Sequence, residues 1–157
     1  MEKPVALVAA EVAADTKPSL YPAQYAARMA GRSKRRLSQV FGMTNFGVNL
    51  TTLAPGASSA LRHAHTLQDE FIYIVSGNPI LHTDDGKHQM APGMCAGFQA
   101  GTGNAHRLLN DSDADVTYLE IGDRSAGDEA VYPDDDMKAV QVDGVWLFLH
   151  KDGSAIE

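Results

Sequence analysis

The segment RHAHTLQDEF, residues 62–71, holds two histidines one residue apart, followed by an Asp-Glu pair. Residues two apart on a β-strand project to the same side, so His63 and His65 can present two imidazoles to one metal ion. A turn at TLQD would begin the next strand at Glu70 and bring its carboxylate beside them. Two neutral nitrogens and a carboxylate suit a divalent cation, and His106 is the best candidate for a further ligand.

The choice between the two acidic residues depends on the strand that follows them. In EFIYIV, Glu70 alternates with Ile72 on one face, whereas Asp69 would share a face with Phe71. Either register gives apolar neighbours, so the spacing favours Glu70 without excluding Asp69. The remaining histidines lack such a setting, and we expect them to be ordinary polar residues: His82, His88 and His150.

Short strands are the elements that would position these side chains. In TNFGVNLTTL, residues 44–53, Phe46, Val48 and Leu50 alternate with small or polar residues, which is the period of a half-buried strand. Turn residues such as Asp85-Gly86 and Pro92-Gly93 separate further short segments. We expect strands within residues 36–43, 60–65, 70–77, 79–83, 87–91, 94–99, 105–110, 116–122 and 145–150. This pattern is typical of an antiparallel sandwich or barrel.

The strand EFIYIV is apolar on both faces, so a second layer must cover its outer side. The other sheet, the N-terminal arm or another subunit could provide that cover. We expect a homodimer. The single cysteine, Cys95, is expected to be a small buried apolar residue.

The first part of the chain is expected to differ from the rest. Residues 1–35 contain three prolines and predict an irregular arm, and residues 36–157 a barrel domain with a C-terminal strand. Within the arm, PAQYAARMAG predicts a short helix that ends at Gly31. The basic run at residues 28–36 is interpreted as solvated surface. The alternative is a phosphate-binding rim, which requires the arm to fold over the barrel mouth.

The charge and composition exclude several classes of protein. A formal net charge of −7 argues against nucleic-acid binding, which needs a basic face. No apolar stretch approaches the roughly 18 residues of a membrane span. A single cysteine cannot form an intrachain disulfide, which fits a reducing compartment. We therefore expect a soluble, cytoplasmic protein.

Two longer segments resemble the signature motifs of the cupin superfamily. GASSALRHAHTLQDEFIYIVSG, residues 56–77, resembles the first motif with its H-x-H, its glutamate and its closing glycine. APGMCAGFQAGTGNAHRLLN, residues 91–110, resembles the second, whose histidine and asparagine correspond to His106 and Asn110. Gly56 lies one residue further from His63 than is usual, and the motif's Pro-x-Gly-x-x-His is altered before His106. The resemblance covers roughly residues 45–122.

The resemblance implies a small single-domain cupin, or monocupin. The implied fold is all-β, a double-stranded β-helix (jelly-roll barrel) preceded by the irregular arm. The implied cofactor is one divalent metal ion, Fe, Mn, Ni or Zn, with four ligands: His63, His65, Glu70 and His106. Four protein ligands on an octahedral ion leave two adjacent positions for substrate, water or oxygen, whereas four-coordinate zinc would be nearly closed.

The implied function is that of a metal-dependent enzyme acting on a small polar molecule. Isomerase-like or epimerase-like chemistry on a sugar phosphate or another hydroxy-carbonyl compound is the first expectation. A metal-dependent dioxygenase and a non-catalytic cupin that binds a metal or a small ligand are the alternatives. No catalytic residue can be named from the sequence, since a metal-bound water or a carboxylate could serve as general base.

Overall fold

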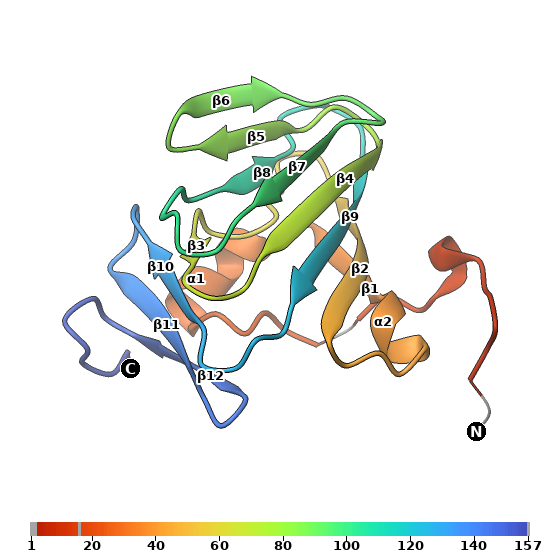
Figure 1. Cartoon of the computed structure of the whole chain (residues 1–157). Helices are drawn as coiled ribbons and strands as arrows, with labels where there is room; N and C mark the ends of the chain where they lie inside the picture. The colour runs from red at the N-terminus through yellow and green to blue at the C-terminus, as the bar shows by residue number, and fades with distance from the viewer. Residues whose placement is uncertain (1–2, 16, 157) are drawn as a thin grey trace.

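The computed structural model describes residues 3–15 and 17–156, which form antiparallel strands and short helical turns (Figure 1). The helical elements are η1 (Ala9–Glu11), α1 (Ala23–Ala26), η2 (Ala27–Met29) and α2 (Leu37–Val40). The strands are β1 (Arg32–Arg36), β2 (Phe46–Leu53), β3 (Ala64–His65), β4 (Glu70–Ser76), β5 (Ile80–Thr83), β6 (Gly86–Gln89), β7 (Cys95–Phe98), β8 (Arg107–Leu109), β9 (Val116–Asp123), β10 (Glu129–Tyr132), β11 (Met137–Val142) and β12 (Val145–Leu149).

The strands form three sheets with the orders β1-β2-β9-β4-β7, β12-β11-β10-β3 and β6-β5-β8. All pairings are antiparallel. Residues of the five-stranded sheet pack against Leu81 of β5 and Leu108 of β8 in one apolar cluster. A second cluster joins the inner face of β10 and β11 to Met29 and Leu61. The predicted all-β double-stranded β-helix is therefore confirmed.

Strand alternation in β4 follows the prediction. Ile72 and Ile74 are buried, whereas Phe71 and Tyr73 are 40% and 41% exposed. Glu70 shares the inward face with the two isoleucines, because residues two apart on a strand point the same way. This places the Glu70 carboxylate inside the barrel.

The strand predicted within residues 36–43 is wrong. Leu37–Val40 form the one-turn helix α2, which ends in a Schellman motif. The N–H of Gly42 donates to Gln39 O, the N–H of Met43 donates to Ser38 O, and Gly42 has a φ of 67°. The segment therefore lies beside β2 as a helical turn, and its glycine is a helix cap.

The N-terminal arm contributes a strand to the barrel. The short helix predicted before Gly31 is present as α1 and η2. After it, β1 pairs with β2 along its whole length at the edge of the five-stranded sheet. The division at residue 35 stays a prediction, and β1 runs across it. The arm lies against the barrel mouth, because its residues 15 and 17–21 line the central cavity.

Strand β1 also changes the interpretation of the basic run. Arg32, Lys34 and Arg36 point to the inner side of the sheet and line the central cavity. The solvated-surface interpretation fits Arg28, whose side chain is 43% exposed, but is wrong for Lys34, which is 25% exposed and paired with Glu120.

Two further findings concern the outside of the molecule. Cys95 lies exposed on β7, so the expectation that it is buried is wrong. Across residues 3–15 and 17–156, no helix is both long and apolar enough to cross a membrane.

Candidate metal centre

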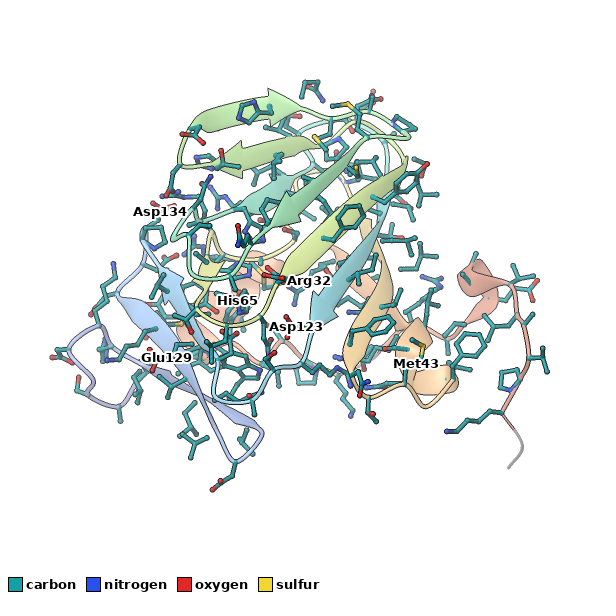
Figure 2. All side chains as sticks on the ribbon, viewed as in Figure 1. Arg32, Met43, His65, Asp123, Glu129 and Asp134 are labelled. Carbon is teal, nitrogen blue, oxygen red and sulfur yellow. The ribbon has the colours of Figure 1, made fainter. Side chains whose placement is uncertain are left out.

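A cavity of about 500 Å³ lies inside the barrel, between the five-stranded sheet and the β10–β12 hairpins. Its walls carry His63, His65, Glu70 and His106 together with the inward residues of β1. Figure 2 shows the labelled side chains of Arg32 and His65 near the centre of the molecule. The cavity therefore gathers residues from distant parts of the chain.

His63 and His106 face each other across two neighbouring backbone segments. Their main chains exchange two hydrogen bonds, His63 N to His106 O at 3.2 Å and His106 N to His63 O at 2.8 Å. Their ring centroids are 4.9 Å apart, and both residues are buried. This bridge fixes the second-motif histidine beside the first-motif histidine, although they are 43 residues apart in the chain.

Aromatic rings hold these two imidazoles in place. Phe98 stacks on His106 with an interplanar angle of 3°, and Tyr132 stacks on His63 with an angle of 28°. The Nδ1 of His63 lies 2.7 Å from the carbonyl oxygen of Leu61. If Nδ1 carries the proton for that bond, Nε2 is left as a bare nitrogen ligand pointing into the cavity.

The Glu70 carboxylate lies at the centre of the histidines. Its Oε2 is 2.9 Å from His106 Nε2, 3.4 Å from His63 Nε2 and 3.6 Å from His65 Nε2. This buried oxygen makes no hydrogen bond of acceptable geometry within the described part of the chain. Ring nitrogens converging on an unsatisfied carboxylate oxygen fit a divalent cation between them.

The electrostatics of the cluster favour an ionised Glu70. Burial raises the pKa of Glu70, but the contacts with His106 and His63 outweigh burial and leave the pKa well below its usual range. Burial lowers the pKa of His63, but the neighbouring Glu70 raises it by more, so the pKa lies above its usual value. Burial lowers the pKa of His106, and Glu70 offsets this only in part. The site therefore combines a carboxylate with at least one imidazole that burial keeps neutral, as metal ligation requires.

His65 lies slightly apart from the other three side chains. The ligand atoms of His63, Glu70 and His106 lie within 4.8 Å of one another, and His65 is outside that group. Its Nδ1 is 2.5 Å from Oδ2 of Asp128, a side chain with no exposed surface. The other oxygen of Asp128 accepts hydrogen bonds from the backbone N–H groups of residues 66–68. Asp128 thus orients the ring so that Nε2 faces Glu70.

Asp69 and the other histidines lie outside this cluster. Asp69 Oδ1 accepts the N–H of Ala100, on the loop that leads to His106. The loop's Gly101 donates to the carbonyl of His65 at 2.9 Å and has a φ of 77°. His150 contacts Asp136, and neither it, His82 nor His88 lines the cavity. Glu70 is therefore the carboxylate that the fold directs inward.

A second polar group on the cavity wall was not foreseen from the sequence. Glu120 Oε1 is 2.5 Å from Lys34 Nζ and 2.8 Å from Asn49 Nδ2, and its Oε2 accepts the Tyr118 hydroxyl at 3.2 Å. Burial raises the pKa of Glu120, but Lys34 outweighs it, so the pKa lies below its usual range. Glu120 is ionised at neutral pH and takes no part in the histidine cluster.

The sequence held a signal for only one of the two missed carboxylates. In VTYLEIG, Glu120 alternates with Tyr118 and Val116 on what becomes the inner face of β9, so a buried acid was predictable there. Asp128 stands in a loop before β10, and no periodicity marks its role. Arg62, the neighbour of His63 in the chain, forms ion pairs with Asp84 and Asp134.

Comparisons with known proteins agree with this architecture. A family model described as the cupin domain matches residues 49–122. A sugar phosphate isomerase from a cupin superfamily, from Silicibacter pomeroyi, is 41% identical; the alignment covers 97% of this chain and 96% of that one, with a TM-score of 0.91. Comparison with curated proteins finds no match.

More distant structures share the architecture. A putative sugar phosphate isomerase from Acidithiobacillus ferrooxidans is 26% identical, covering 91% of this chain and 99% of that one, with a TM-score of 0.73. A polyketide cyclase from Streptomyces resistomycificus is 18% identical, and the alignment covers 78% of this chain and 80% of that one, with a TM-score of 0.60. At this identity the similarity shows a shared fold and no shared activity.

Proposed function

Because the chain belongs to the cupin superfamily and carries an ionised glutamate, Glu120, on the wall of the cavity that holds the histidine cluster, we propose that it is a metal-dependent isomerase or epimerase. Its substrate is a small hydroxy-carbonyl compound, with sugar phosphates as the class to test first. The similarity to a sugar phosphate isomerase at 41% identity supports this choice. The cavity of about 500 Å³ is large enough for such a molecule.

One divalent ion, Fe, Mn, Ni or Zn, is held by His63, His65, Glu70 and His106. The convergence of three Nε2 atoms on Glu70 Oε2 supports this ligand set. The bound ion supplies Lewis-acid polarisation of a substrate carbonyl or hydroxyl oxygen. The stacked rings of Phe98 and Tyr132 keep two of the ligands in one orientation.

The Lys34–Glu120 pair is the observation that carries the proposal. Isomerisation needs a base that takes the proton from the carbon bearing a hydroxyl group next to the carbonyl. The C–H electron pair then becomes the C=C bond of an enediol, and the carbonyl oxygen takes up a proton. The first proton then returns to the neighbouring carbon, while the original hydroxyl oxygen gives up its proton and becomes the new carbonyl, so that the proton taken up by one oxygen is balanced by the proton lost from the other. Glu120 is ionised at neutral pH. Lys34 and Asn49 contact its Oε1, whereas its Oε2 accepts the Tyr118 hydroxyl at 3.2 Å and keeps a second lone pair for a proton.

The test is solvent exchange followed by NMR. Untagged protein of measured metal content is incubated in D₂O with a panel of sugar phosphates. We expect deuterium at the carbon next to the carbonyl. Glu120→Gln should slow this exchange about 10²-fold or more while keeping its metal, since general base catalysis contributes about 10²–10⁴-fold.

Variants of the histidines test the ligand set separately. His63→Ala and His106→Ala should lose most of the metal, whereas His82→Ala, which removes a histidine outside the cavity, should keep it. Equal metal content in all three would contradict the ligand assignment. Metal-loaded protein that turns over no sugar phosphate or keto acid, with or without oxygen, would support a non-catalytic binding cupin instead.

We further propose that two copies pair through the outer face of the five-stranded sheet. Phe71, Tyr73 and Val75 of β4 and Phe46 of β2 are 39–46% exposed there. An apolar face can pair with the same face of a second copy about a two-fold axis, the commonest symmetry of soluble oligomers. Tyr73→Lys should therefore shift the mass in analytical ultracentrifugation from dimer to monomer, whereas Val145→Lys, on the distant β12, should not.

A further inference from the structure

Arg32 differs from the other two cations of β1 that face the cavity. Lys34 pairs with Glu120 and Arg36 pairs with Asp15, so both have a carboxylate partner. The Nη1 of Arg32 donates to the carbonyl oxygen of Ser59 at 2.6 Å and lies 3.4 Å from the sulfur of Met29. Within residues 3–15 and 17–156, no carboxylate lies within 4.0 Å of its guanidinium.

A partly buried cation without a counter-ion is costly. Arg32 is only partly exposed and lines the cavity, so its charge is removed from much of the solvent. A guanidinium has five N–H donors, and the contacts of Nη1 leave Nε and Nη2 without a hydrogen-bond acceptor in the described ranges. The bond to Ser59 O fixes the group in place, with a donor edge left for a ligand.

Arg32 also lies within reach of the histidine cluster. Its partner Ser59 is four residues before His63, so the Cα atoms of these two residues are at most about 14 Å apart. Arg32 and His63 line the same cavity, together with Glu120 and Lys34. A small extended ligand held at the cluster by one end can therefore place its other end at Arg32.

We propose that Arg32 binds the anionic group of the substrate, a phosphate monoester, in the cavity that it shares with the histidine cluster. A guanidinium fork matches two phosphate oxygens and is the most specific donor for this group. The proposal rests on the proposed function for the identity of the substrate, but the phosphate subsite itself does not require turnover. Such a ligand would provide the missing counter-ion.

Isothermal titration calorimetry of the metal-loaded protein tests this subsite with three probes: fructose 6-phosphate, fructose and inorganic phosphate. We expect fructose 6-phosphate to bind the wild type, and Arg32→Gln to weaken that binding about ten- to hundredfold, the range for hydrogen bonds to a charged group. Arg32→Lys, which keeps the charge but not the fork, should recover part of the affinity. Inorganic phosphate should bind more weakly, but its affinity should fall in the same order from wild type to Arg32→Lys to Arg32→Gln. The affinity for fructose should be the same for the wild type and both variants.

Arg35→Gln is the matched control. It removes the same charge from the same strand, but Arg35 alternates to the outer face, where its Nε donates to Ala10 O at 3.1 Å. Its phosphate affinity should stay within twofold of the wild type. If Arg32→Gln does not fold, Arg32→Lys still provides the comparison.

The outcomes separate the subsite from the reaction. Unchanged affinity in both Arg32 variants, an equal loss in Arg35→Gln, or no phosphate binding to the wild type would overturn the subsite. Phosphate binding that depends on Arg32 in a protein that exchanges no substrate proton would leave the subsite in place and refute the isomerase.

Discussion

Asp128 offers the sharpest test of how the fold prepares the metal centre. Its side chain is fully buried, its Oδ2 lies 2.5 Å from Nδ1 of His65, and its Oδ1 accepts three backbone N–H groups of the 66–68 turn. In Asp128→Asn the amide oxygen must stay with these backbone donors. The NH₂ group then faces His65 and donates to Nδ1, which moves the ring proton to Nε2.

The consequence should be large for metal binding and small for folding. A proton on Nε2 blocks the nitrogen that lies 3.6 Å from Glu70 Oε2. Loss of such an orienting partner weakens metal binding about 10–100-fold, or about 1.4–2.7 kcal/mol. The backbone hydrogen bonds persist without their charge, so the free energy of unfolding of the metal-free protein should fall by only about 1–2 kcal/mol.

Competition with a chromophoric chelator measures the metal affinity, and ¹⁵N NMR of the imidazole reports the tautomer of His65. Asp123→Asn is the control, because Asp123 also accepts backbone N–H groups, from Asp69 and Ser125, but makes no hydrogen bond to a histidine of the described residues. Unchanged metal affinity in Asp128→Asn, or an equal loss in Asp123→Asn, would refute the reasoning.

Three further predictions concern stability. Glu120→Gln leaves Lys34 unpaired and should lower the free energy of unfolding by about 1–3 kcal/mol at pH 7, less than for a fully buried pair because both side chains are about a quarter exposed. The pKa of Glu120 is lowered in the folded state, so the extra free energy of unfolding of the wild type over the variant should be complete above the unfolded pKa near 4.5 and vanish as the pH falls through the folded value. Urea titrations at pH 7, 5 and 3 measure this difference. A difference that grows on acidification would contradict the pairing. Asn110→Ala removes a buried amide that donates to the carbonyls of Leu53 and Ala114, and should cost about 2–4 kcal/mol in the same titration at pH 7, with a loss below 1 kcal/mol counting against its role. Gly77→Ala should lower the melting temperature by several degrees, because φ is 80° and the new Cβ would lie 2.8 Å from Asp115 O; an unchanged melting temperature would show that the turn can relax.

The fold was largely predictable because strands carry a two-residue period. In β4 the alternation placed Ile72 and Tyr73 on opposite faces, and the structure buries Ile72 and leaves Tyr73 41% exposed. The period failed where a single helical turn replaced a strand, at Leu37–Val40. Four residues are too few to separate a helical from an extended pattern, and Gly42 acts there as a helix cap.

For the candidate site, the sequence by itself determined which residue types lie together locally. Spacing placed His63 and His65 near Glu70, and the motif order added His106. Only the tertiary structure brought Asp128 to His65, and Lys34 to Glu120, pairs that are 63 and 86 residues apart. Local periodicity says which face of a strand a residue occupies, but strand order and register decide what it faces across the barrel. The metal-ligand pattern can therefore be recognised in short segments of the sequence. The positions of the supporting carboxylate, Asp128, and of the cations of the cavity depend on how the strands assemble.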